Sequence, residues 1–129
     1  MITGIGIDLV RTKRIASWMD RDGMVERFFH PDEIEYAKGR GAEGAASLAA
    51  RFAAKEAFGK ALGTGLAGLR LRDICVRSDA RGKPYIALEG PSSAVFLKCG
   101  GGVIQCSLSH EGDYAAAFVV IEKDQPHAG

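Results

Sequence analysis

The stretch AASLAARFAAKEAFGKAL, residues 45–62, decides how this chain is expected to fold. Alanine has the highest intrinsic helix propensity and recurs throughout it, while Leu48, Phe52 and Phe58 supply apolar bulk. Gly63 follows directly, and glycine is the residue that most often ends a helix. The stretch therefore predicts one long helix, whose many small side chains let other backbones or a ligand come close.

The chain ahead of this helix is expected to begin with a strand at residues 2–10, which are rich in β-branched and apolar side chains. Gly4 and Gly6 lie inside it, where glycine often marks the close approach of another backbone or of a ligand. Shorter helical segments are expected next, at residues 11–20, 24–29 and 30 to about 39. Pro31 suits the first turn of the last of these, because proline needs no backbone partner there.

Beyond Gly68 the apolar pattern changes to a period of two, which is typical of strands. Strands are expected at residues 71–78, 84–88, 103–109 and 114–121. Turns at 79–82 and 110–113 join them in pairs, and a short helix at 90–98 separates the pairs. This order indicates an α+β fold, with a mostly antiparallel sheet packed by the long helix, in a single domain spanning residues 1–129.

Composition excludes several classes of protein. With 17 basic and 16 acidic residues the chain lacks the basic excess of a general nucleic-acid binder. It has no apolar run long enough to span a membrane and no signal-peptide pattern at its start. Its three cysteines form no C-x-x-C pair, so we expect reduced thiols in a cytoplasmic protein.

Two segments carry acidic and basic groups beyond what a plain core requires. Asp8 ends an apolar strand, where a carboxylate can be a turn cap or a metal ligand. Glu56 and Lys60 lie one helical turn apart, as do Arg51 and Lys55. Such spacings are typical of an ordinary helix that carries surface ion pairs. A carboxylate and an ammonium on one face also suit a metal-bound polyphosphate, because the acid holds the cation and the lysine meets a phosphate oxygen.

A third segment, Ser107-Leu108-Ser109-His110, ends a predicted strand. Alternation puts Ser107 and Ser109 on one face of the strand and Leu108 on the other. His110 can be a turn residue or a catalyst. A hydrolase is disfavoured, because the chain has no G-x-S-x-G elbow and no acid placed to orient the histidine.

Taken together these segments resemble the 4′-phosphopantetheinyl transferases, and among them the small bacterial type that modifies acyl carrier proteins. The matching stretches occur in family order and spacing, and they are 4–10, 13–15, 51–61, 82–85 and 107–110. The resemblance implies a Mg²⁺-dependent transfer of the 4′-phosphopantetheine group from coenzyme A to a serine of apo-acyl carrier protein. It also implies release of adenosine 3′,5′-bisphosphate, a role in fatty acid biosynthesis, and a homotrimer with active sites between subunits.

Residue by residue, the resemblance implies that Asp8 and Glu56 hold Mg²⁺ and that Lys60 completes the catalytic set. Glu56 is the expected general base, either directly or through a metal-bound water. The implied coenzyme A contacts are Arg51, Lys60, Gly63, Pro84 and His110. Arg14 matches a residue that contacts the carrier protein, and the neighbouring basic residues are expected to steer that acidic partner.

The chain departs from the family pattern at two positions. Glu43 stands where family members usually carry a basic partner for the 3′-phosphate of coenzyme A, and Arg40 is the nearest cation. Met24 stands where relatives can carry a second arginine that faces the carrier. The alternative function is a non-catalytic module that binds coenzyme A or the carrier, but such a module would not need Asp8, Glu56 and Lys60.

The strand at 114–121 is almost entirely apolar, so it has too few polar side chains to keep one face in water. We expect its second face to be buried against neighbouring subunits. The alternative is that helices of the same chain cover it.

Overall fold

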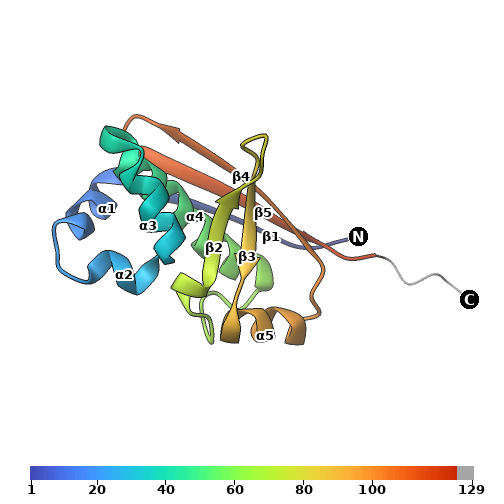
Figure 1. Ribbon diagram of the computed structural model, residues 1–129. Helices are drawn as coiled ribbons and strands as arrows, with labels where there is room; N and C mark the ends of the chain where they lie inside the picture. Colours follow the sequence, from blue (N-terminus) through green and yellow to red (C-terminus); the bar gives the residue numbers. More distant parts are fainter. Residues whose placement is uncertain (125–129) are drawn as a thin grey trace, which may run out of the picture.

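Helix α4 (Gly44–Leu62) runs through the middle of the molecule. The structure is a computed structural model and describes residues 1–124. One side of α4 packs on a sheet, and the other sides meet shorter helices and a β-hairpin (Figure 1). The predicted long helix is confirmed, and Gly63 ends it with a φ of 82°. Nearly every side chain of α4 from Leu48 to Ala61 is buried, which is why its sequence is apolar all round.

The sheet beside α4 contains β1 (Ile2–Arg11), β5 (Tyr114–Glu122) and β4 (Val103–Glu111), in that order and antiparallel throughout. In its register Asp8 on β1 and Leu108 on β4 both lie opposite Ala117 of β5. The predicted turn at 110–113 is too long, because its first two residues belong to β4. Strand pairing continues to the end of β4, so His110 lies in the strand and the connection is shorter.

The small residues of β1 and α4 explain how closely the sheet and helix pack. A Cβ atom at Gly6 would collide with the carbonyl oxygen of Ala57, and one at Gly4 with that of Ala61. The close approach predicted for these glycines is therefore that of the α4 backbone. Because larger side chains would push β1 away, glycine on the strand and alanine on the helix fix the distance between them.

The remaining elements surround the other sides of α4. They are α1 (Thr12–Met19), α2 (Met24–Phe28), α3 (Pro31–Lys38), η1 (Gly41–Glu43), η2 (Leu71–Asp73), β2 (Ile74–Ser78), β3 (Pro84–Leu88) and α5 (Gly90–Lys98). Strands β2 and β3 form a separate antiparallel hairpin rather than joining the larger sheet. The predicted strand 71–78 is correct only from Ile74, because the amide of Asp73 bonds back to the carbonyl of Arg70 and closes a 3₁₀ turn.

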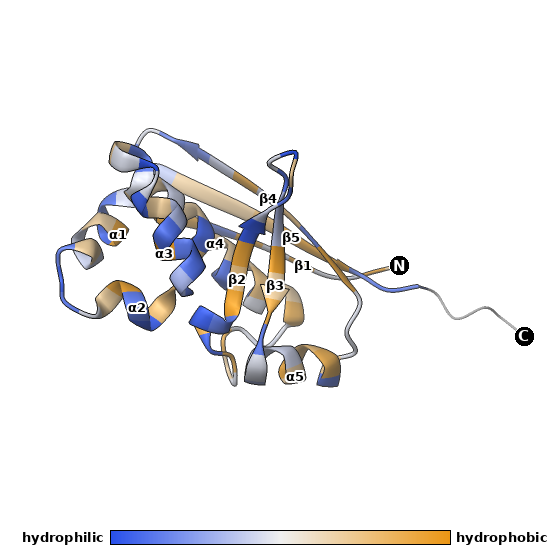
Figure 2. Cartoon of the chain, viewed as in Figure 1, coloured by the Kyte–Doolittle hydropathy of each residue, from blue (hydrophilic) through white to orange (hydrophobic). Residues whose placement is uncertain are grey.

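An aromatic cluster fills the space between α1, α2 and α4. Trp18 meets Phe52 edge-on with ring centroids 5.1 Å apart. Phe28 packs against both of these rings, and Phe29 packs against Phe52. Apolar colouring along β2, β3 and the sheet strands marks the rest of the core (Figure 2). Among the described residues, the helices are all too short or too polar to cross a bilayer.

On β1 and β5, the face of the larger sheet that points away from α4 is mostly apolar, and the described residues 1–124 leave it uncovered. Ile5, Ile7 and Leu9 are each more than 60% exposed, and Phe118 of β5 is 43% exposed. Within residues 1–124, no helix covers the second face of β5, so the alternative that helices of the same chain cover it is wrong for the described part.

Candidate active site

Asp8 and Glu56 lie on β1 and α4, whose backbones are in contact. Asp8 follows Gly6 on the strand face that meets the helix, and its side chain is 18% exposed. Burial raises the pKa of Glu56, and the nearby charge of Asp8 raises it further. The effect of Asp8 on the pKa of Glu56 requires the two carboxylates to be close together, and the effect of burial means that Glu56 is partly shielded from water. The turn-cap alternative for Asp8 is wrong, because β1 continues to Arg11.

Lys60 joins this pair of carboxylates from the next turn of α4. Its Nζ atom donates to Asp8 Oδ1 at 3.0 Å and to the carbonyl oxygen of Ile7 at 2.9 Å. Its side chain is half exposed, so it can reach a ligand as well as Asp8. No ion pair joins Glu56 to Lys60 in the part of the chain that is described. Asp8, Glu56 and Lys60 thus form a group that a polyphosphate with its cation could contact.

Arg14 approaches the same group from α1. Its guanidinium lies over the rings of both Trp18 and Phe52, at 5.3 Å from each centroid. Its charge lowers the pKa of Glu56 and so opposes part of the shift caused by burial and Asp8. Arg14 is exposed to solvent on α1, and it is also close enough to Glu56 for its charge to act on that carboxylate.

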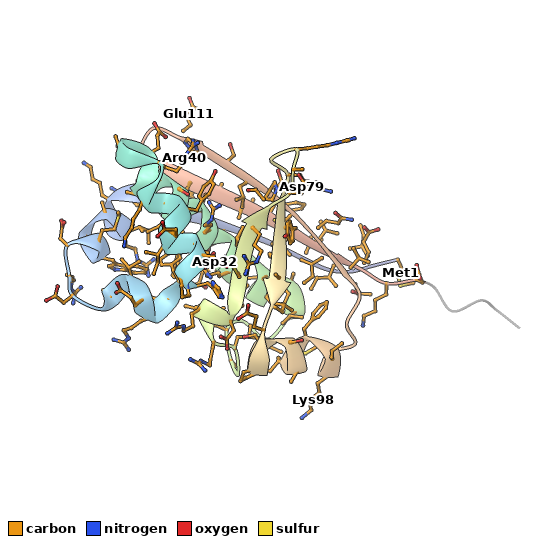
Figure 3. The ribbon with its side chains drawn as sticks, in the orientation of Figure 1. Met1, Asp32, Arg40, Asp79, Lys98 and Glu111 are labelled. Carbon is orange, nitrogen blue, oxygen red and sulfur yellow. The ribbon has the colours of Figure 1, made fainter. Side chains whose placement is uncertain are left out.

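A cleft of about 280 Å³ opens on another side of α4, between α3, the β2–β3 hairpin and β4. Arg51, Pro84 and His110, all predicted to contact coenzyme A, line it together. Arg40 and Glu43 line it too, so the acid that departs from the family pattern and the nearest cation face one space. Figure 3 labels Arg40 near the end of α3 and Asp79 at the tip of the hairpin.

Arg51 is the best-held cation of the cleft. Its Nη1 atom donates to Ser47 Oγ at 2.9 Å, and its guanidinium lies 4.3 Å from the ring centre of Tyr36. Its Nε atom is buried and has no hydrogen-bond partner among the described residues. A fixed guanidinium with an unused donor suits a phosphate or another anion.

The structure does not gather every predicted site residue. Gly63 ends α4 and lies outside the residues that line the cleft. His110 and Leu108 both line the cleft, so they share one face of β4. Ser107 and Ser109 are exposed on the opposite face, as the alternation predicted. The serine–histidine pairing that a hydrolase would need is therefore not formed.

Sequence reasoning missed a buried ion pair between Lys55 and Glu33. Lys55 and Arg51 were noted only as lying one turn apart, and the interpretation that such residues belong to a helix with surface ion pairs is wrong for Lys55, because its side chain is fully buried. The available signal was the apolar neighbourhood of Lys55, with Ala54 before it and alanine again at position 57. A lysine between such residues points into the core, where it needs a counter-charge.

Comparison with known proteins agrees with this geometry. Residues 4–119 match the model of the 4′-phosphopantetheinyl transferase superfamily. The holo-(acyl-carrier-protein) synthase of Treponema denticola is 49% identical over 122 residues, which cover 95% of this chain and 99% of that protein. The crystal structure of the Neisseria meningitidis synthase superposes with a TM-score of 0.85 at 39% identity, covering 95% of this chain and all of that one.

A Bacillus anthracis synthase, whose structure is described as a complex with CoA (3′,5′-ADP), is 37% identical with a TM-score of 0.79 and covers 96% of this chain and 99% of its own. The chain therefore belongs to the 4′-phosphopantetheinyl transferase superfamily. Its relatives are holo-(acyl-carrier-protein) synthases, and the resemblance noted in the sequence is confirmed. The chain is an enzyme, a phosphopantetheinyl transferase of that type.

Proposed function

We propose that the protein transfers the 4′-phosphopantetheine group of coenzyme A to a serine of apo-acyl carrier protein, with Mg²⁺, and so supports fatty acid biosynthesis. The observation that carries the proposal is the group formed by Asp8, Glu56 and Lys60, together with a cleft on another side of α4 that Arg51 and Arg40 line. Solved complexes of relatives with coenzyme A support the choice of donor.

The residues present suit a magnesium ion. Mg²⁺ prefers oxygen ligands, and in phosphoryl-transfer sites it commonly binds one or two carboxylates and keeps water and substrate oxygens in its other positions. Asp8 and Glu56 are such a pair. Burial raises the pKa of Glu56 and repulsion from Asp8 raises it further, and a bound cation would offset both effects. When bound there, Mg²⁺ would neutralise charge on the pyrophosphate.

The chain's own residues account for the other requirements of the reaction. Arg51 and Arg40 bind phosphate oxygens of coenzyme A in the cleft, and Lys60 meets the pyrophosphate beside Asp8. The serine oxygen of the carrier forms a bond to the β-phosphorus, and the bond from that phosphorus to the oxygen of adenosine 3′,5′-bisphosphate breaks. Glu56 accepts the serine proton, directly or through a water molecule.

The uncovered face of the larger sheet supports a homotrimer. Ile5, Ile7, Leu9 and Phe118 form an apolar surface that a soluble monomer rarely exposes. Association with other copies of the chain would remove this surface from water. We propose that each active site is completed by a neighbouring subunit.

Incubation of the protein with apo-carrier, coenzyme A and Mg²⁺ tests the proposal, with the carrier mass as the readout. A non-catalytic binding module would bind coenzyme A in the same mixture but would leave the carrier mass unchanged.

A further inference from the structure

Lys55 of α4 and Glu33 of α3 form an ion pair that is closed off from solvent. Lys55 Nζ lies 2.7 Å from Glu33 Oε1, and both side chains are 0% exposed. Burial lowers the pKa of Lys55, and the attraction of Glu33 opposes that shift. Neither residue has a part in the chemistry described above.

The other partners of this pair are all backbone groups. Lys55 Nζ also donates to the carbonyl oxygens of Leu71, at 2.8 Å, and of Ile74. Glu33 accepts from the amides of His30, at 2.9 Å, and of Val76, at 3.0 Å. All three ammonium hydrogens are used. The pair therefore ties α4 to α3, to η2 and to β2 through groups that cannot rotate away.

Three of the elements joined in this way, α3, α4 and β2, also contribute walls of the cleft. Tyr36 comes from α3, Arg51 from α4 one turn before Lys55, and Ser78 and Pro84 from the β2–β3 hairpin. Asp8 and Glu56, by contrast, are brought together where α4 packs against β1, at the Gly6–Ala57 contact. Separate contacts thus hold the two halves of the site.

A second ion pair links α3 to β2 but differs in burial. Arg77 Nη1 lies 2.7 Å from Asp32 Oδ2, with side chains 33% and 59% exposed. Exposed pairs contribute little, because water screens their attraction. Arg77→Met therefore gives a matched control for Lys55→Met, since each removes one cation between the same elements.

We propose that Lys55 and Glu33 are positioning residues for the donor, which hold the cleft walls at the separation that coenzyme A requires. Their loss should weaken coenzyme A binding while sparing the transfer step, because Asp8 and Glu56 are held elsewhere. The inference rests on the proposed function.

The test measures the Kd of coenzyme A by calorimetry, together with kcat at saturating coenzyme A, for Glu33→Gln, Lys55→Met and Arg77→Met. We expect the first two to raise the Kd by about tenfold to a hundredfold, the range for a misplaced binding residue. Their kcat should stay within about threefold of the parent value. Arg77→Met should keep the parent Kd. A lower melting temperature with an unchanged Kd in both buried variants would overturn the inference.

Calorimetry separates this inference from the proposed function. If the unaltered protein does not bind coenzyme A, the proposed function fails. If it binds and the buried variants bind equally well, only the positioning role fails.

Hydrogen exchange in the unaltered protein gives a second test that no folding defect can obscure. The Val76 amide donates to Glu33 rather than to a strand partner, so its exchange rate reports this contact. Coenzyme A binding should slow exchange at Val76 by about tenfold or more, since the ligand stabilises the joined walls. An unchanged rate at saturating coenzyme A would contradict the proposal.

Discussion

Lys60 Nζ lies 3.0 Å from Asp8 Oδ1, although 52 positions separate the two residues. The contact exists because β1 packs directly on α4, and it puts a cation beside the two carboxylates that are the proposed metal ligands. Several consequences of this arrangement can be measured.

Replacing either carboxylate should remove activity without unfolding the protein. We expect Asp8→Asn and Glu56→Gln to lower kcat by about a hundredfold or more, the scale for loss of an acid–base or electrostatic group. Their melting temperatures should not fall, because each change removes repulsion between partly buried carboxylates. Glu35→Gln, a change at an exposed position on α3, is the control and should leave both kcat and the melting temperature unchanged. Near-normal rates in both site variants would exclude the metal assignment.

The packing of β1 on α4 should tolerate no side chain at position 6. Gly6→Ala puts a methyl group against the Ala57 carbonyl, and we expect a loss of about 3 kcal/mol in the free energy of unfolding, the upper part of the range for overpacking. Gly39→Ala is the control, since its φ is −70° and a Cβ there meets only ordinary contacts. Equal denaturation midpoints for the two variants would show that the close approach does not fix the fold.

These predictions show what the sequence could and could not reveal. The extent of α4 was predictable, because alanine propensity and the Gly63 stop act locally. The start of β2 was not, because the carbonyl of Leu71 bonds to Lys55 and the segment turns there. The partner of Lys55 was also hidden, since Glu33 lies 22 residues away and only the fold brings the two together. The sequence identified Arg51, Pro84 and His110 one by one, but it did not show that they line a single cleft.

Glu43 should weaken coenzyme A binding in this particular chain. It lines the cleft with Arg40 and Arg51, and its carboxylate would face the phosphates of the donor. We expect Glu43→Lys to lower the KM for coenzyme A by about threefold to tenfold and Arg40→Ala to raise it by a similar factor. Dephospho-coenzyme A, which lacks the 3′-phosphate, should respond less to both changes. Identical responses for the two donors would place the 3′-phosphate away from these residues.

Arg14 should affect the carrier rather than the donor. It is exposed on α1 near other basic residues, and acyl carrier proteins are acidic. Arg14→Glu is expected to raise the KM for the carrier by about tenfold or more and to leave the Kd of coenzyme A unchanged. Added salt should have the same effect on the unaltered enzyme. If neither Arg14→Glu nor added salt changed the KM for the carrier, this surface would be excluded as the carrier-binding site.

The apolar face of the larger sheet should hold the subunits together. Phe118 lies opposite Ile7 in the register of β5 and β1, so a charge there falls in the middle of the face. We expect Phe118→Glu to give monomers by light scattering and to lose most activity. Leu97→Glu, at an exposed apolar position on α5, is the control and should keep the parent mass. An unaltered protein that is monomeric and fully active would contradict the shared site.

The central claim is tested most directly by the mass of the carrier. Apo-acyl carrier protein is incubated with coenzyme A and enzyme, with Mg²⁺ or with a chelator, and compared with a reaction that contains Glu56→Gln. The account predicts that the carrier gains one phosphopantetheine group only with the unaltered enzyme and Mg²⁺. A carrier of unchanged mass, in a mixture where calorimetry shows that coenzyme A is bound, would contradict it.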